Sequence, residues 1–276
     1  MFWQTTRFRI DLTQPRVMGI VNVTPDSFSD GGAHANTAAA LAHCEQLLKD
    51  GADILDIGGE STRPGAQPVT VDEELARVLP VLEGALKLGC PVSLDTLKPE
   101  VMQAALDRGV DIVNDVNALR APGAVERVAA HAACGVCLMH MQGEPRSMQA
   151  LPAYADVVAE VGAFLAARAG LLRRHGVAAE RIVLDPGIGF GKSVEHNFAL
   201  LRGQPALLEA GYPLLAGWSR KSSLGAVTGR AAGARLIASV AAALAAVQHG
   251  ASIVRVHDVA ATVDALKVWR AAGLPG

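Results

Sequence analysis

The chain has 276 residues, of which 50% are hydrophobic and 19% are charged, and its formal net charge is −2. A chain of this length and composition can bury a large core, as one large domain or two small ones. The charge leaves no electrostatic footprint for nucleic acid. The most apolar stretch, residues 236–247, is too short to span a membrane, and residues 1–16 lack the apolar core of a signal peptide. We therefore expect a soluble, cytoplasmic protein with no membrane or nucleic-acid partner.

A short apolar run, a polar or glycine-bearing turn and a longer helical stretch recur along the chain. Residues 1–16, before the first run, look like a short hairpin that would cap the bottom of a barrel. Eight strands are then predicted, over residues 17–23, 52–58, 91–96, 111–116, 135–141, 181–187, 213–219 and 252–258. Each is followed by an alanine- and leucine-rich stretch with helical spacing, which is typical of parallel β/α units. Residues 221–233, after the seventh strand, are interpreted as a loop.

Eight β/α units in roughly 250 residues are the number found in a closed (β/α)8 TIM barrel. No proline- or serine-rich linker divides the sequence, so we expect residues 1–276 to form a single α/β barrel domain. A doubly wound open sheet is the alternative, because the number of strands does not by itself prove closure.

A C-x-x-C pair, Cys134 and Cys137, lies just before His140. The spacing permits a metal or redox site, but a second pair of ligands is missing from the sequence. The segment has the pattern of a helix end that runs into a buried strand. We interpret the cysteines as small buried hydrophobic side chains and His140 as a hydrogen-bonded wall residue.

Residues 184–193, LDPGIGFGKS, resemble a phosphate-binding loop. A P-loop needs two glycines separated by four residues before Lys-Ser, and Pro186 stands where the first of them should be. The dinucleotide-binding pattern fails as well, because Lys192 occupies the position of its third glycine. The glycines are therefore expected to turn the chain tightly after Asp185.

Polar side chains stand at or just after the end of every predicted strand. In a barrel these ends form one mouth, together with the loops that follow them, and the active site lies there. The residues are Asn22, Asp56, Asp95, Asn114, His140, Asp185, Ser219, Lys221, Arg255 and His257. Carboxylates and amides suit a flat heterocycle with adjacent N–H donors, and cations suit an anionic group. We expect a ligand with an amino-heterocycle at one end and phosphate at the other.

Three acidic residues near these ends have an ordinary structural interpretation. Asp56, Asp115 and Asp258 are expected to be helix caps or ion-pair partners. Arg220, beside Lys221, is expected to face solvent or a partner.

Eight stretches of the sequence together carry a family resemblance. They are MGIVNVTPDSFSDGG, DIGGESTRPGA, SLDT, NDV, MHMQGEPRSMQ, LDPGIGFGKS, GWSRKSSLG and VRVHDV. In this order and spacing, from about Val17 to Trp269, the chain resembles the dihydropteroate synthase family. The resemblance implies a transferase of folate biosynthesis that joins p-aminobenzoate to 6-hydroxymethyl-7,8-dihydropterin pyrophosphate and forms 7,8-dihydropteroate, with release of pyrophosphate. It also implies an Mg2+ cofactor, a homodimer, and sulfonamides as competitors of p-aminobenzoate.

The resemblance further implies roles for individual residues, in four groups. The pterin pocket would be formed by Asp95, Asn114, Asp185 and Lys221. Arg255 and His257 would anchor pyrophosphate, and Thr62 and Arg63 would complete a loop that organises when pyrophosphate and p-aminobenzoate bind. The p-aminobenzoate pocket would involve Phe28, Pro64, Phe190 and Ser222. Asn22 would bind magnesium, and the residues expected to act in catalysis are Asp95, Lys221 and Arg255.

Two other functions stay open at this point. A pterin-dependent methyltransferase shares the barrel and its Asp/Asn ring but does not need the STRPG, SRKS and RVHD motifs, all of which are present. A non-catalytic pterin-binding paralogue would be expected to have lost an anchor, and the anchors are intact. The sequence departs from the family pattern at Ala238, where glycine is common, and alanine is compatible with a helix there.

Overall fold

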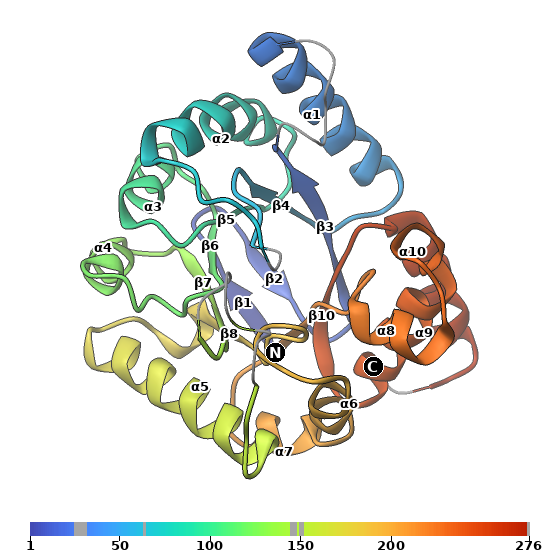
Figure 1. Ribbon diagram of the computed structural model, residues 1–276. Helices are drawn as coiled ribbons and strands as arrows, with labels where there is room; N and C mark the ends of the chain where they lie inside the picture. Colours follow the sequence, from blue (N-terminus) through green and yellow to red (C-terminus); the bar gives the residue numbers. More distant parts are fainter. Residues whose placement is uncertain (25–31, 63–64, 144–147, 149–151, 275–276) are drawn as a thin grey trace.

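Eight parallel strands close into a barrel in the computed structural model, which describes residues 1–24, 32–62, 65–143, 148 and 152–274 (Figure 1). Around the barrel they are β3 (Arg16–Asn22), β4 (Ile54–Gly58), β5 (Val92–Asp95), β6 (Ile112–Asp115), β7 (Gly135–Met139), β8 (Ile182–Asp185), β9 (Leu214–Ala216) and β10 (Ala251–Val256). All eight predicted strands are confirmed. The open-sheet alternative is wrong, because β10 pairs with both β9 and β3 and so closes the sheet.

Helices surround the barrel and cover its outer face (Figure 1). They are α1 (Gly32–Lys49), α2 (Val71–Ala85), α3 (Pro99–Leu106), α4 (Ala124–Ala130), α5 (Val157–Arg174), α6 (Val194–Arg202), α7 (Gln204–Leu208), α8 (Ser222–Thr228), α9 (Leu236–Gln248) and α10 (Val259–Ala271). Within the described part of the chain, none of them is long and apolar enough to cross a membrane.

The strands are buried on both faces, as parallel barrel strands are. In β7, Val136 and Leu138 belong to the core beneath the helices, whereas Cys137 belongs to the cluster inside the barrel. Cys134 packs in the outer core, and burial raises the pKa of its thiol to about 12. The two cysteines therefore lie in different clusters, as neutral core side chains.

Residues 222–228 form helix α8, so the interpretation of residues 221–233 as one loop is wrong. Lys221 has an extended backbone immediately before the helix, and Gly229 ends the helix with a left-handed φ of 69°. Glycine adopts this conformation without a steric penalty and commonly ends helices. In the sequence, Gly229 could have indicated the end of this helix. The helix begins at Ser222, directly after Lys221.

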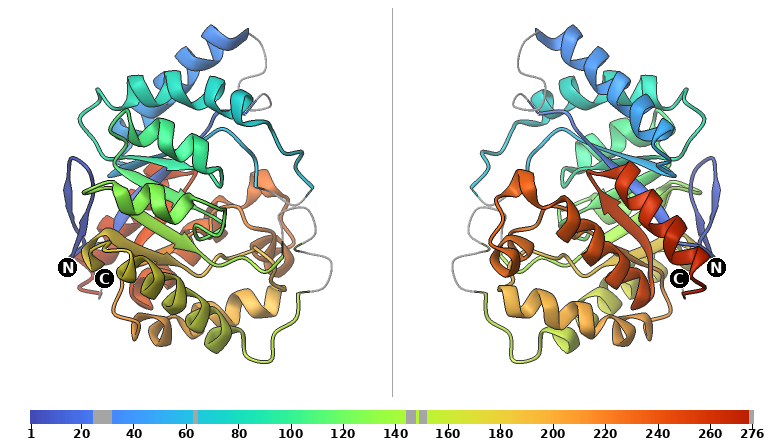
Figure 2. Two further views of the ribbon diagram at one scale, coloured as in Figure 1. Left: turned by 90° about the vertical axis from the view of Figure 1, so that its left-hand side faces the viewer. Right: turned by 90° about the vertical axis from the view of Figure 1, so that its right-hand side faces the viewer.

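A hairpin of two antiparallel strands, β1 (Phe2–Gln4) and β2 (Arg9–Asp11), closes one end of the barrel. Figure 2 shows it at the same end as both chain termini. The indole of Trp3 is completely buried against the inward side chains of the strands and donates from Nε1 to the Arg181 carbonyl at 2.9 Å. This end of the barrel is therefore filled by apolar side chains.

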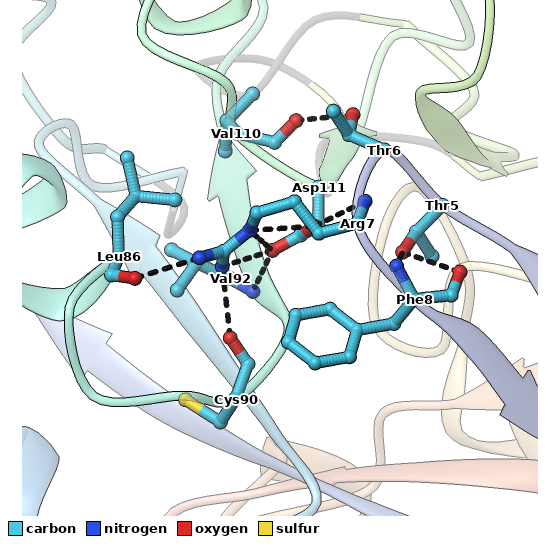
Figure 3. A network of polar contacts seen from close by, with 9 residues as sticks. All are labelled: Thr5, Thr6, Arg7, Phe8, Leu86, Cys90, Val92, Val110 and Asp111. Carbon is cyan, nitrogen blue, oxygen red and sulfur yellow. Dashed lines mark hydrogen bonds and ion pairs between the residues drawn. The ribbon is translucent and has the colours of Figure 1, made fainter.

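Arg7, in the turn of the hairpin, ties it to the starts of β5 and β6 (Figure 3). Its guanidinium donates to Asp111 Oδ2 at 2.6 Å and to the carbonyls of Leu86 and Cys90 at 2.6 and 3.0 Å. The buried Asp111 carboxylate also accepts from the Val92 amide at 2.9 Å. The hairpin is thus held by charge-assisted hydrogen bonds as well as by Trp3.

Candidate active site

A cavity of about 680 Å³ opens at the carboxyl ends of the barrel strands. The predicted site residues that line it are Asn22, Thr62, Asp95, Asn114, Asp185, Phe190, Lys221, Ser222, Arg255 and His257. The other three, Phe28, Arg63 and Pro64, lie outside the described residues. Ten predicted side chains from separate strand ends and loops therefore share one cavity, as the barrel rule requires.

Arg255, on β10, lies between two carboxylates. Its Nε donates to Asp56 Oδ2 at 2.6 Å and a terminal nitrogen donates to Asp95 Oδ2 at 2.6 Å. Asp56 is completely buried and also accepts from Asn114 Nδ2 at 3.1 Å. Burial acts to lower the pKa of Arg255, but the attraction of Asp56 and Asp95 outweighs it and raises that pKa. The guanidinium is thus held charged and in one orientation.

Asp95 carries the excess negative charge of this group. Burial raises the pKa of its carboxyl to about 7; the Arg255 guanidinium opposes this rise, and the neighbouring Asp56 carboxylate adds to it. One guanidinium balances only one of two carboxylates, so the second is easier to protonate than a carboxyl in water.

In another part of the cavity, the Asp185 carboxylate and a cluster of apolar side chains both line the wall. Asp185 is 6% exposed and accepts from the Gly187 amide at 2.7 Å. Burial raises the pKa of Asp185, while the hydrogen bond from Gly187 lowers it. The apolar cluster at this point contains Val116, Met139 and Met148, with Phe190 packed against it. Acceptors beside an apolar wall suit a flat ring that has donors on its edge.

Cationic side chains come from the loop after β9 and the end of β10. The Lys221 ammonium lies over the Phe190 ring, 4.2 Å from its centroid. The His257 ring lies 3.0 Å from Ser219 Oγ, which also accepts from the His257 amide at 3.1 Å. Arg220 lines the cavity and donates twice to Asp258, at 2.6 and 3.1 Å, so both are ion-pair partners. Basic side chains therefore line this side of the cavity.

The glycine-rich turn after Asp185 depends on left-handed backbone. Gly187 and Gly191 have φ values of 69° and 65°. A Cβ at Gly187 would collide with the His140 carbonyl oxygen, and one at Gly191 would collide with the Gln142 carbonyl. Only glycine fits both requirements. The prediction that these glycines turn the chain tightly is confirmed.

Three polar residues at or near the cavity were not predicted from the sequence. Lys192 is 2% exposed and lies beneath the glycine turn. Glu60 accepts from Lys98 Nζ at 2.6 Å and from the Val69 amide at 3.1 Å, and Lys98 also donates to Glu74 at 2.7 Å. This cluster ties together the two ends of the segment that carries Thr62. Each of these charges has partners distant in sequence, which no local pattern reveals.

Asn22, at the end of β3, offers one amide oxygen to a metal. The described residues contain no group of three or more His, Cys, Asp or Glu side chains that could hold one. Mg2+ commonly keeps several waters and binds through one or two protein oxygens plus the phosphates of a substrate. The donors present therefore fit a magnesium ion held mainly by a phosphate ligand.

Known proteins resemble this chain over almost its whole length. The family model for pterin binding enzymes matches residues 18–257. The dihydropteroate synthase of Neisseria meningitidis serogroup B is 58% identical, over 99% of this chain and 98% of its own.

Two solved structures of relatives have the same fold, and each is a complex with a ligand. That of Burkholderia cenocepacia dihydropteroate synthase complexed with 7,8-dihydropteroate has a TM-score of 0.89 and 53% identity, over 99% of this chain and 96% of that one. The Yersinia pestis dihydropteroate synthase with a sulfonamide drug complex has a TM-score of 0.93 and 44% identity, over 99% of both chains. On the fold, the cavity and these likenesses, the chain belongs to the dihydropteroate synthase family of pterin-binding enzymes.

Proposed function

We propose that this protein joins p-aminobenzoate to 6-hydroxymethyl-7,8-dihydropterin pyrophosphate, forming 7,8-dihydropteroate and releasing pyrophosphate. The observation that carries the proposal is the content of one cavity: a carboxylate and amide edge, an apolar wall and a cluster of cations. The pterin, the aryl amine and the pyrophosphate each need one of these.

The pterin ring is assigned to the edge formed by Asp185 and Asn114. A carboxylate accepts two parallel hydrogen bonds from the 2-amino group and N3–H of the ring, which fixes its orientation. The Asn114 amide donates to Asp56, so its rotation is restricted before a ligand arrives. Lys221 is assigned to the O4 and N5 side of the ring.

The second substrate is assigned to the side of the cavity formed by Phe190 and Ser222. An aryl amine is neutral at pH 7 and nucleophilic, so no general base is required for its attack. The demanding step is departure of pyrophosphate, and Arg255 and His257 oppose its growing negative charge. Asn22 would hold a magnesium ion, which would supply further positive charge at the phosphate group.

The relatives favour synthesis over the two alternative functions. The similar proteins carry the name dihydropteroate synthase, and one of the solved structures contains 7,8-dihydropteroate. A methyltransferase does not need the STRPG, SRKS and RVHD motifs, and an inactive paralogue would be expected to have lost an anchor such as Lys221 or Arg255, yet all of these are present.

We also propose three properties of the protein beyond the reaction itself. Sulfonamides resemble p-aminobenzoate and compete at Phe190 and Ser222, as the complex of the Yersinia pestis relative suggests. The protein acts in the cytoplasm, and its four free cysteines agree with a reducing compartment. It forms a homodimer through α8, α9 and α10, where Val227, Ile237 and Val268 are 65%, 84% and 70% exposed.

Pyrophosphate release from the purified protein tests the reaction. The assay contains 6-hydroxymethyl-7,8-dihydropterin pyrophosphate, with and without p-aminobenzoate and Mg2+. We expect release that depends on both, with 7,8-dihydropteroate as the second product. Tight binding of the pterin without any release contradicts the proposal and identifies an inactive paralogue.

A further inference from the structure

The buried amino group of Lys192 has only uncharged acceptors among the residues that the structure describes. Its ammonium lies 2.9 Å from the Gly187 carbonyl, 3.0 Å from the Phe190 carbonyl and 2.9 Å from His140 Nδ1. The His140 carbonyl is a fourth and longer neighbour, at 3.3 Å. An ammonium has three N–H donors, so the three short contacts use all of them.

These contacts join the two halves of the substrate cavity. Gly187 donates from its amide to Asp185 Oδ1 and accepts at its carbonyl from Lys192. The same ammonium holds the carbonyl of Phe190, whose ring lies beneath the Lys221 ammonium. The carboxylate assigned to the pterin and the ring assigned to p-aminobenzoate are thus linked through one side chain.

Burying a cation without a carboxylate partner is unfavourable, and an apolar side chain of similar length would avoid that cost. Burial accordingly lowers the pKa of Lys192 to about 7, and Asp185 acts in the opposite direction. His140 is also buried, which lowers its pKa to about 3 and leaves Nδ1 able to accept. Since the carbonyls of the left-handed turn point to a site with little solvent, they need a donor from the protein.

We propose that Lys192 is a positioning residue for both substrates: it fixes the turn of residues 187–191 and so sets the Phe190 ring relative to the Asp185 carboxylate. The inference rests on the proposed function, because it assigns each end of the turn to one substrate of that reaction. Lys192 touches neither substrate and acts through the backbone of the turn.

The substitution Lys192→Met tests the proposal, because it keeps the length of the side chain and removes the donors. We expect KM for p-aminobenzoate to rise about tenfold, the size of effect produced by losing a hydrogen bond to a charged group. The affinity for 6-hydroxymethyl-7,8-dihydropterin pyrophosphate, measured by calorimetry, is expected to fall several-fold, with kcat changed less than KM.

Arg181→Met is the matched control. Arg181 is 4% exposed and likewise donates to backbone carbonyls, those of Cys134 and Val128 at 2.7 and 3.0 Å, near the closed end of the barrel. Both variants are expected to melt at a lower temperature, but only Lys192→Met is expected to change KM. Wild-type constants in Lys192→Met, with a lowered melting temperature, overturn the proposal and leave Lys192 a purely structural residue.

A second variant keeps the proposal testable if Lys192→Met does not fold. His140→Phe removes one acceptor of the ammonium but retains a ring against Phe164, whose centroid lies 4.9 Å from that of His140. We expect the same pattern with a smaller rise in KM. An unchanged KM in this folded variant counts against the proposal.

A double-mutant cycle with Phe190→Leu tests the route of the effect. If Lys192 acts through the Phe190 ring, its substitution raises KM less in the Phe190→Leu background than in the wild type. Independent, additive effects contradict this route. Turnover by the unsubstituted protein is measured first: its absence refutes the proposed function, whereas calorimetry with the pterin still tests the role of Lys192.

Discussion

Asp185 must serve two donors at once, the Gly187 amide and the edge of a ligand. The first bond is 2.7 Å long and uses one lone pair of Oδ1, so the other lone pair of Oδ1 and the oxygen Oδ2 remain for the two donors on the ligand edge. In Asp185→Asn the amide keeps one acceptor oxygen and places an NH2 group where an acceptor is required.

We therefore expect Asp185→Asn to weaken binding of 6-hydroxymethyl-7,8-dihydropterin pyrophosphate by about 10- to 100-fold, the equivalent of losing a charge-assisted hydrogen bond. Calorimetry measures this directly. Asp264→Asn, whose side chain is 77% exposed on α10, is the matched control and should bind normally. Normal pterin binding by Asp185→Asn would falsify the role assigned to this carboxylate.

Asp95 makes the stability of the protein depend on pH near neutrality. Its pKa is raised from 3.8 to about 7 in the folded state, so the folded protein retains a proton that the unfolded chain releases above about pH 4. Retaining it contributes stability that is complete below pH 4 and lost as pH rises through about 7. We expect the free energy of unfolding in urea to fall as pH rises from about 4 to about 7, and to fall less in Asp95→Asn. Equal slopes in the two proteins contradict the assignment to Asp95.

At the scale of elements, the β1–β2 hairpin is expected to support the fold without affecting catalysis. Arg7→Leu removes the guanidinium from the buried Asp111 carboxylate and from two carbonyls. Because the Arg7 side chain is 32% exposed, we expect a loss of about 2 kcal/mol, below that of a fully buried pair. Denaturant unfolding measures the loss, and kcat/KM of the remaining folded enzyme should be unchanged. A normal midpoint contradicts a stabilising role for the Arg7 guanidinium.

The strands were predictable from sequence because each is a short apolar run buried on both faces. In β7, successive side chains pack alternately in the core beneath the helices and in the cluster inside the barrel. Helix α8 was not, because its serines and glycines are poor helix formers and its stability comes from packing and from the Gly229 end. At the site, strand ends identified Asp185 and Asn114 correctly as cavity residues. The Arg255–Asp56 pair spans 199 residues, so only the closed barrel reveals it.

At the scale of the whole molecule, helices α8, α9 and α10 cluster on one side of the barrel (Figure 1), and each carries an exposed apolar side chain, Val227, Ile237 or Val268. Ile237→Glu places a charge in the middle of the proposed dimer contact and is expected to give a monomer by analytical ultracentrifugation, whereas the wild type sediments as a dimer. Ala166→Glu, on the exposed face of α5, is the control and should remain dimeric. A wild-type monomer at micromolar concentration contradicts the proposed interface.

Trp3 fills one end of the barrel, and in the described part of the chain the substrate cavity opens at the opposite end, where the strands finish. Asp185 and Asn114, at 6% and 4% exposure, lie at its inner end, while Ser222 stands exposed near the rim. A ligand that binds Asp185 must therefore enter before a ligand binds near Ser222, and it cannot dissociate while the outer position is occupied. The two substrates leave together as one joined product, but a compound that binds near Ser222 without reacting would slow the escape of a pterin already bound at Asp185.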